Sequence, residues 1–218
     1  MLKFTSLLFW IALCPTYLFG QIKINCCEIR QTIPVFKSDS AKLFLSHQHL
    51  LKTNVLLPLK KSDSHLEIRI LSYYGHYSTT IVIKCGHNKV FVDRYYSSSA
   101  PFDTKYKYVG DVYPGDSLFV KHISGIKLQS PETWDLFFKK LIENHFFDLP
   151  NDNAITNIVD KENPKASSII HDGAIYYEVK VGSHYRNVMY TNLFANEADK
   201  ISFVKYQMNL KQLFSQFY

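Results

Sequence analysis

The stretch LEIRILSYYGHYSTTIVIKCGHNKVFVDRYY, residues 66–96, decides the fold class. Leu66, Ile68 and Ile70 alternate with Glu67 and Arg69, which is the period of a strand with one buried face. Residues 78–85 and 89–96 are rich in β-branched and aromatic side chains, and the Gly86-His87-Asn88 run between them tolerates positive φ angles. We therefore expect a strand followed by a β-hairpin, which begins an antiparallel sheet.

The segments on either side continue this pattern less clearly. Residues 106–112 and 117–123 form a second expected strand pair around the turn Pro114-Gly115-Asp116. Upstream, residues 28–36 are a candidate strand, whereas residues 41–57 mix the helical and the extended period.

The hydrophobic period changes to that of a helix after residue 130. Ser130 is the expected N-cap, Pro131 suits the first helical position, and the helix should end near Asn144. An apolar stripe with helical spacing follows the cap: Trp134, Phe137, Phe138, Leu141 and Ile142.

The C-terminal part again places strands before a helix. Asp172-Gly173 predicts a turn into an alternating strand at 175–181, and Gly182-Ser183 predicts a hairpin back through 185–190. A final helix over about residues 197–217 carries a broad apolar face: Ile201, Phe203, Val204, Met208, Leu210, Phe214 and Phe217. The order strands–helix–strands–helix predicts an α+β fold, in which two main helices pack on one face of an antiparallel sheet. We expect one domain over residues 21–218, after a signal peptide at 1–20.

The signal-peptide prediction rests on Lys3 followed by an apolar run at 7–13, with Gly20 as a small residue before the cleavage point at Gln21. This run is too short and interrupted for a membrane span, so no transmembrane anchor is expected after cleavage. Lipid attachment at Cys14 is the alternative to simple cleavage. Simple cleavage is favoured because bulky Leu13 precedes that cysteine. Both routes place the protein outside the cytoplasm, in the periplasm or the extracellular space.

Charge and cysteine content narrow the possible functions. The formal net charge is +6, but the basic residues are scattered instead of forming one stripe, so we expect no nucleic-acid partner. Cys26, Cys27 and Cys85 would remain after cleavage. This odd number allows one disulfide, between Cys85 and either neighbour, together with one free thiol, and the alternative is three unpaired thiols.

A set of short runs marks the part of the chain from residue 134 onward: WDLFFKKLI (134–142), FDLP (147–150), Asp172-Gly173, YYEV (176–179) and Tyr185-Arg186. Together with Phe19-Gly20-Gln21 at the end of the leader, these runs resemble a family of uncharacterised exported proteins of Bacteroidota. The resemblance implies export and brings no activity and no site residues.

The sequence contains none of the familiar signatures of hydrolases, nucleotide-binding proteins or zinc proteases, so no catalytic, cofactor-binding or metal-binding residue is assigned. His47 and His49, with Asp63 or His65 as a third ligand, form the best metal hypothesis, and His76 is the best candidate for a base. The simpler interpretation is that His47, His49 and His76 are solvated polar or packed side chains without such a role. Asp148, Asp152 and Asp160 lack the glycine of a calcium loop.

Aromatic residues supply the one compositional hint of recognition. Tyrosines of the hairpin region could form an exposed patch, although strands favour aromatic residues in any case: Tyr73, Tyr74, Tyr77, Tyr95, Tyr96, Tyr106 and Tyr108. We expect a non-catalytic exported protein that binds a protein or a glycan. The alternative is a small hydrolase or metal-dependent enzyme built from dispersed His and Asp residues.

Overall fold

The structure is a computed structural model of the 218-residue chain. It describes residues 21–36, 50–51, 54–74, 77–86, 89–98, 111–112, 119–128, 132–150, 154–155, 157–158, 161, 167–195 and 202–218. The expected signal peptide and Cys14 lie outside these ranges.

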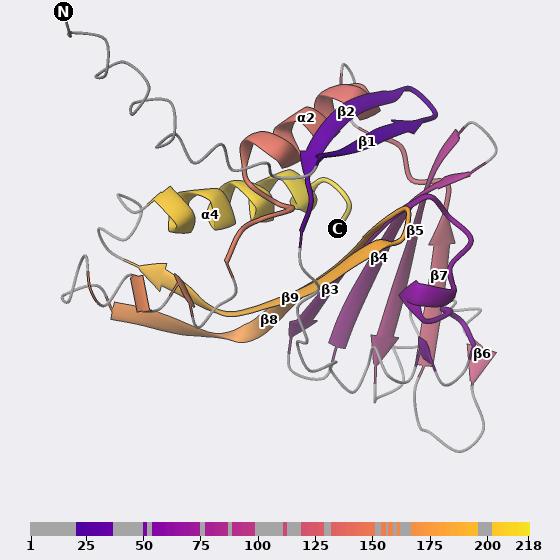
Figure 1. The fold of residues 1–218 in the computed structure, drawn as a ribbon. Helices are drawn as coiled ribbons and strands as arrows, with labels where there is room; N and C mark the ends of the chain where they lie inside the picture. The colour runs from indigo at the N-terminus through magenta and orange to yellow at the C-terminus, as the bar shows by residue number, and fades with distance from the viewer. Residues whose placement is uncertain are drawn as a thin grey trace, which may run out of the picture.

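A seven-stranded antiparallel sheet with strand order β6-β7-β5-β4-β3-β8-β9 forms the centre of the molecule (Figure 1), and β1 and β2 form a separate hairpin. The elements are β1 (Gln21–Cys26), β2 (Ile29–Pro34), the 3₁₀ helix η1 (Leu59–Lys61), β3 (Leu66–Tyr74), β4 (Tyr77–Gly86), β5 (Lys89–Ser98), β6 (Asp111–Val112), β7 (Phe119–Ser124), α2 (Trp134–Glu143), β8 (Ser167–Val181), β9 (His184–Ala195) and α4 (Ser202–Ser215). This arrangement confirms the expected α+β fold class.

The hairpins expected from the alternating stretches are confirmed. β4 and β5 pair in a register that sets Ile83 opposite Val92 and Gly86 opposite Lys89. β8 and β9 meet at Val181 and His184, where Gly182 has a φ of 59°, a value that suits glycine. β6 and β7 also pair, although residues 106–110 and the turn at 114–116 lie outside the described residues.

Residues 172–173 do not form the expected turn. They lie within β8, where Gly173 pairs with Tyr74 of β3. The register between β8 and β9 shifts between Ile170 and Ile175, which marks a β-bulge. A glycine inside a strand commonly accompanies such a bulge, so the same residue pair that favours a turn is accommodated here by an irregular strand.

The N-cap of α2 is Thr133, and the prediction of Ser130 is wrong. The Thr133 Oγ1 accepts a hydrogen bond of 3.3 Å from the backbone N–H of Leu136. Threonine is also a good cap residue and stands directly before the apolar stripe, so it takes that position in place of Ser130. Asn144 ends the helix as expected.

The buried face of α4 differs from the predicted one. Val204, Leu210 and Phe214 are buried, but Met208 is 48% exposed and Gln207 is buried in its place. Residue 207 lies three positions after Val204 and in line with the stripe, whereas residue 208 is turned about 100° further around the helix. Residues 197–201, where the helix was expected to start, lie outside the described ranges.

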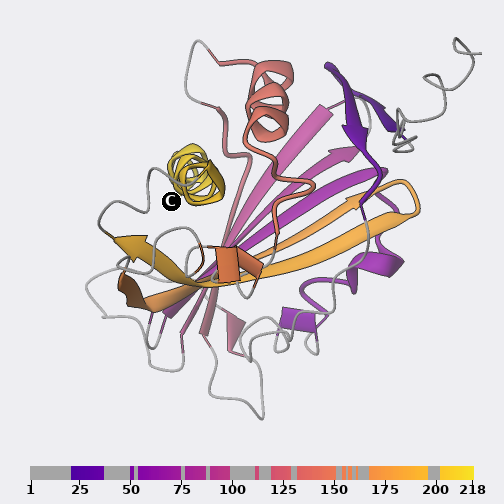
Figure 2. The ribbon, with the colours of Figure 1, turned by 60° about the vertical axis from the view of Figure 1, so that its left-hand side comes forward.

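Both helices lie on one side of the sheet, as expected, and the β1–β2 hairpin lies on that side too (Figure 2). They bury a single apolar core. Its members on the sheet include Leu66, Ile68, Ile70, Ile81, Ile83, Val92, Tyr177, Val179 and Val181, and its members on the helices include Phe137, Phe138, Leu141, Leu210 and Phe214.

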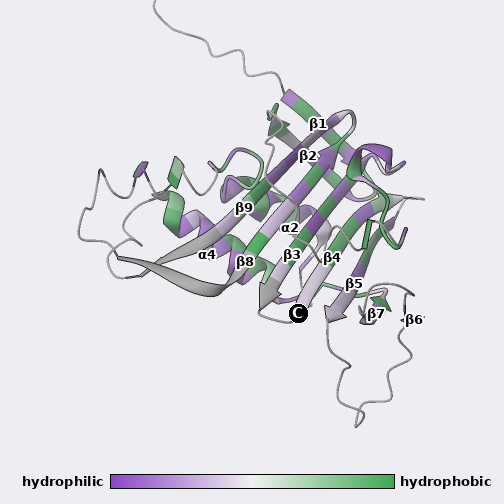
Figure 3. Ribbon diagram, turned by 90° about the horizontal axis from the view of Figure 1, so that it is seen from below, coloured by the Kyte–Doolittle hydropathy of each residue, from purple (hydrophilic) through white to green (hydrophobic). Residues whose placement is uncertain are grey.

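Part of the opposite face of the sheet is also covered. Polar and apolar residues alternate along β3, β4 and β8 in the view of this face (Figure 3). Leu50 and Leu56 pack against Val82 and Tyr95 in a second, smaller apolar cluster. Glu67 and Arg69 are only 4% and 2% exposed, so the expectation that β3 has a single buried face is wrong.

Candidate functional site

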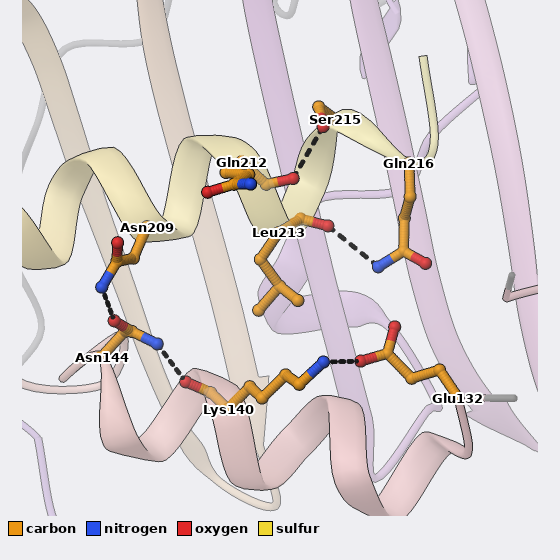
Figure 4. A pocket seen from close by; sticks show the side chains of 8 residues that line it. All are labelled: Glu132, Lys140, Asn144, Asn209, Gln212, Leu213, Ser215 and Gln216. Carbon is orange, nitrogen blue, oxygen red and sulfur yellow. Dashed lines mark hydrogen bonds and ion pairs between the residues drawn. The ribbon is translucent and has the colours of Figure 1, made fainter.

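A groove of about 460 Å³ lies between the last two turns of α4 and the facing side of α2 (Figure 4). This volume falls within the range of roughly 300–1,000 Å³ that is usual for ligand pockets. The lining is mostly polar: Glu132, Lys140, Asn144, Asn209, Gln212, Leu213, Ser215 and Gln216.

Hydrogen bonds across and along the groove hold its walls in place (Figure 4). The Asn209 Nδ2 donates to the Asn144 Oδ1 at 2.8 Å and thereby joins α4 to the end of α2. The Lys140 Nζ donates to the Glu132 Oε1 at 2.6 Å, and the Gln216 Nε2 donates to the carbonyl oxygen of Leu213 at 2.9 Å. The groove is therefore built from side chains that are already positioned.

The chemistry of the groove suits a neutral polar ligand. Its two charged residues, Lys140 and Glu132, form an ion pair with each other, so the lining has no net charge. Within the described part of the chain, the side-chain amide of Gln212 makes no hydrogen bond, and the amide oxygens of Asn209 and Gln216 accept none. Leu213 adds an apolar contact at the centre of the groove. Hydroxyl groups both donate and accept hydrogen bonds, and they match such a lining.

A buried ionic cluster lies on the opposite face of the sheet. The Arg69 Nε donates to the Glu67 Oε1 at 2.7 Å, and its Nη1 donates to the Glu178 Oε2 at 3.3 Å. The third guanidinium contact, from Nη2, reaches the carbonyl oxygen of Leu57 at 2.7 Å. The Ser62 Oγ donates to Glu67, and the Lys180 Nζ donates to the carbonyl oxygen of Ser62. These bonds attach residues 57–62 to the middle of the sheet.

Tyr176 borders this cluster and shows the effect of burial. Its hydroxyl donates to the Glu178 Oε1 at 3.4 Å. Burial, reinforced by the negative charge of Glu178, raises the pKa of the Tyr176 hydroxyl far above its ordinary value of 10.0. Tyr176 therefore remains a neutral hydrogen-bond donor, and it is not a candidate base.

A second cavity, of about 560 Å³, lies at the end of β4 on the same face as the ionic cluster. Asp63, Lys84, Phe91 and Asp93 line it. The Asp93 Oδ1 lies 3.2 Å from the Nε2 of His122, whose ring stacks on Tyr95 at a centroid distance of 4.5 Å. Sequence reasoning missed this pair because Asp93 and His122 lie on different strands, at neighbouring positions that only the β5–β7 register reveals.

Of the histidines and acidic residues singled out from the sequence, the structure describes three: Asp63, His65 and Asp148. His47, His49, His76, Asp152 and Asp160 lie outside the described residues. His65 is exposed, and Asp63 lines the second cavity. The Asp148 Oδ2 lies 3.3 Å from the Nδ1 of His145, in the turn after α2.

The tyrosines considered for a recognition patch give it no support where they are described. Tyr95 is buried and Tyr96 is half-buried. The other five side chains lie outside the described set: Tyr73, Tyr74, Tyr77, Tyr106 and Tyr108.

The three cysteines lie close together, which agrees with the disulfide to Cys85 that the cysteine count allows. Both Cys26 and Cys27 lie within disulfide-bonding distance of Cys85. The same three sulfur atoms lie close enough together to hold a metal ion, so reduced cysteines could bind a soft metal here in place of forming a disulfide.

Comparisons of the chain with protein-family models, with curated protein sequences and with solved structures return no match. Among the described helices, none has the length and apolar composition needed to cross a bilayer.

Proposed function

We propose that this chain is an exported, non-catalytic binding protein and that the groove between α2 and α4 holds a neutral saccharide. The observation that carries the proposal is the pre-positioned polar lining of the groove, which has no net charge. Amide side chains offer a donor and an acceptor in one plane, and Leu213 offers an apolar surface for the C–H groups of a sugar ring. Among the described residues, those that line the groove include no histidine and no cysteine, and the carboxylate of Glu132 is paired with Lys140, which favours binding over catalysis.

Export is the second part of this proposal. It is supported by the leader-like residues 1–20 and by cysteines close enough to form a disulfide, a bond that persists in oxidising compartments. Intact-mass measurement of the protein recovered from the cell envelope tests it. A mass that starts at Gln21 supports simple cleavage, and an added diacylglycerol mass supports lipid attachment at Cys14. A mass that retains Met1 would refute export.

Binding to an array of neutral di- to tetrasaccharides of glucose, galactose, mannose and N-acetylglucosamine tests the groove. We expect binding to be at least tenfold weaker for Asn209→Ala and Gln212→Ala, because each removes an amide from the lining. Lys205→Ala is the matched control, since Lys205 is exposed on the same helix and does not line the groove.

The array also separates a specific groove from an ordinary polar surface. Equal loss of binding in the control and in the two groove variants would refute the groove as the site. Binding of charged saccharides alone would refute the argument from the neutral lining.

The second candidate function is a small hydrolase, and the Asp93–His122 pair beside the second cavity is the observation that favours it. A carboxylate that orients an imidazole is a common arrangement for general base catalysis. Hydrolysis of a panel of nitrophenyl esters and glycosides tests it. Activity that disappears in both Asp93→Asn and His122→Gln would support the enzyme, and activity unchanged in both would exclude this pair as its base.

A further inference from the structure

The turn of the β1–β2 hairpin carries two adjacent cysteines, and both reach the same partner. Cys26 pairs with Ile29 at the end of β1, and Cys27 begins the two-residue turn. The Cα atoms of Cys26 and Cys27 lie 6.3 and 6.6 Å from the Cα of Cys85. Both separations suit a disulfide without movement of the backbone. Because a cystine sulfur forms one S–S bond, Cys85 bonds to one neighbour and leaves the other as a thiol.

The free thiol remains within reach of the disulfide. The Sγ atoms of Cys26 and Cys27 are 3.8 Å apart. Cys85 is only 5% exposed, whereas Cys26 and Cys27 are half-buried. The shared sulfur is therefore protected, and the two interchangeable sulfurs lie nearer the solvent.

The backbone and charge around Cys27 also fit a reactive position. Cys27 has a φ of 58°, in the left-handed region that glycine and asparagine occupy more easily. Residues other than glycine are disfavoured there, and such strain is common at functional sites. The Arg30 Nη1 donates to the carbonyl oxygen of Cys27 at 2.7 Å, so a cation stands beside this turn. The thiolate is the nucleophile in disulfide chemistry.

We propose that Cys26, Cys27 and Cys85 form a thiol–disulfide exchange site. The Cys27 thiolate attacks the Cys85 Sγ, the Cys27–Cys85 bond forms as the Cys26–Cys85 bond breaks, and Cys26 leaves as a thiolate that takes up a proton. No electrons are gained or lost in this step. A low-molecular-weight disulfide, R–S–S–R, reacts with the free thiol in the same way: a mixed disulfide forms on the protein and R–S⁻ leaves.

Mapping of the disulfide tests the internal exchange. The purified protein is equilibrated in a glutathione redox buffer, quenched with acid, blocked with N-ethylmaleimide and digested with trypsin. The linked peptides are residues 24–30 and 85–89, and fragmentation shows whether Cys26 or Cys27 carries the maleimide. We expect both linkages in the wild-type protein, and a disulfide to Cys85 in both Cys26→Ser and Cys27→Ser. A single linkage in the wild-type protein, with one of the two variants left fully reduced, would overturn the proposal.

Uptake of glutathione from its disulfide tests the external exchange. We expect one glutathione per wild-type molecule, and none in either single variant once its disulfide to Cys85 has formed. Circular dichroism confirms that each variant is folded. The competing interpretation is a site for a soft metal ion. If the reduced protein binds one Cu(I) or Zn(II) ion but forms no disulfide in the redox buffer, the three cysteines are a metal site and the exchange proposal is refuted.

Discussion

Replacement of Arg69 by methionine should destabilise the protein strongly, because it leaves two carboxylates buried without their cation. Glu67 and Glu178 are each 4% exposed, and the guanidinium binds both of them as well as the carbonyl oxygen of Leu57. Removal of one partner from a buried ionic cluster costs about 3–5 kcal/mol. Urea denaturation followed by circular dichroism at pH 7 measures the free energy of unfolding.

Two further variants separate charge burial from a general effect of substitution. Lys139 forms an exposed ion pair of 3.9 Å with Glu143, so Lys139→Met should cost less than about 0.5 kcal/mol. The triple variant Glu67→Leu, Arg69→Met and Glu178→Leu removes every charge of the triad and should recover most of the loss, since apolar replacements of whole buried triads are often neutral or stabilising. A loss below about 1 kcal/mol in Arg69→Met, or one equal to that of Lys139→Met, would refute the reasoning.

Three smaller changes test other contacts. Asp135 accepts hydrogen bonds from the backbone N–H of Arg30 and from the side chain of Gln31, and these bonds lower the pKa of its carboxyl group below 3.8. Asp135→Asn should therefore lower the free energy of unfolding by about 1 kcal/mol above about pH 5, and by progressively less as the pH falls through the depressed pKa. A difference from the wild type that does not change with pH in urea denaturation would contradict this. Gln207 is 2% exposed, and neither of its amide atoms has a hydrogen-bond partner among the described residues. Gln207→Met should therefore raise the free energy of unfolding by roughly 1 kcal/mol. A destabilised variant would indicate that Gln207 contacts a segment outside the described residues. Thr133→Ala should cost about 1 kcal/mol, whereas Thr133→Ser should be nearly neutral; equal costs in thermal denaturation would argue against the cap.

Local pattern was enough to predict the hairpins and the apolar stripe of α2, because both depend on residues close in sequence. It was not enough to predict the burial of Arg69. Alternation along β3 shows that the strand has two different faces, but it does not show that residues 50–62 cover the polar one. The groove escaped prediction for a similar reason, since Asn144 and Gln212 each look like ordinary surface residues until α2 and α4 lie side by side.

The position of β3 has a consequence for the newly made chain. One edge of β3 pairs with β4, which follows it directly, but the other pairs with β8, which begins only at Ser167. While the polypeptide emerges from the ribosome, the backbone N–H and C=O groups along this edge of β3 therefore stay unpaired until most of the protein has been synthesised. An unpaired strand edge invites association with other chains, so the first half of the chain is most prone to aggregate before the β8–β9 hairpin has been made.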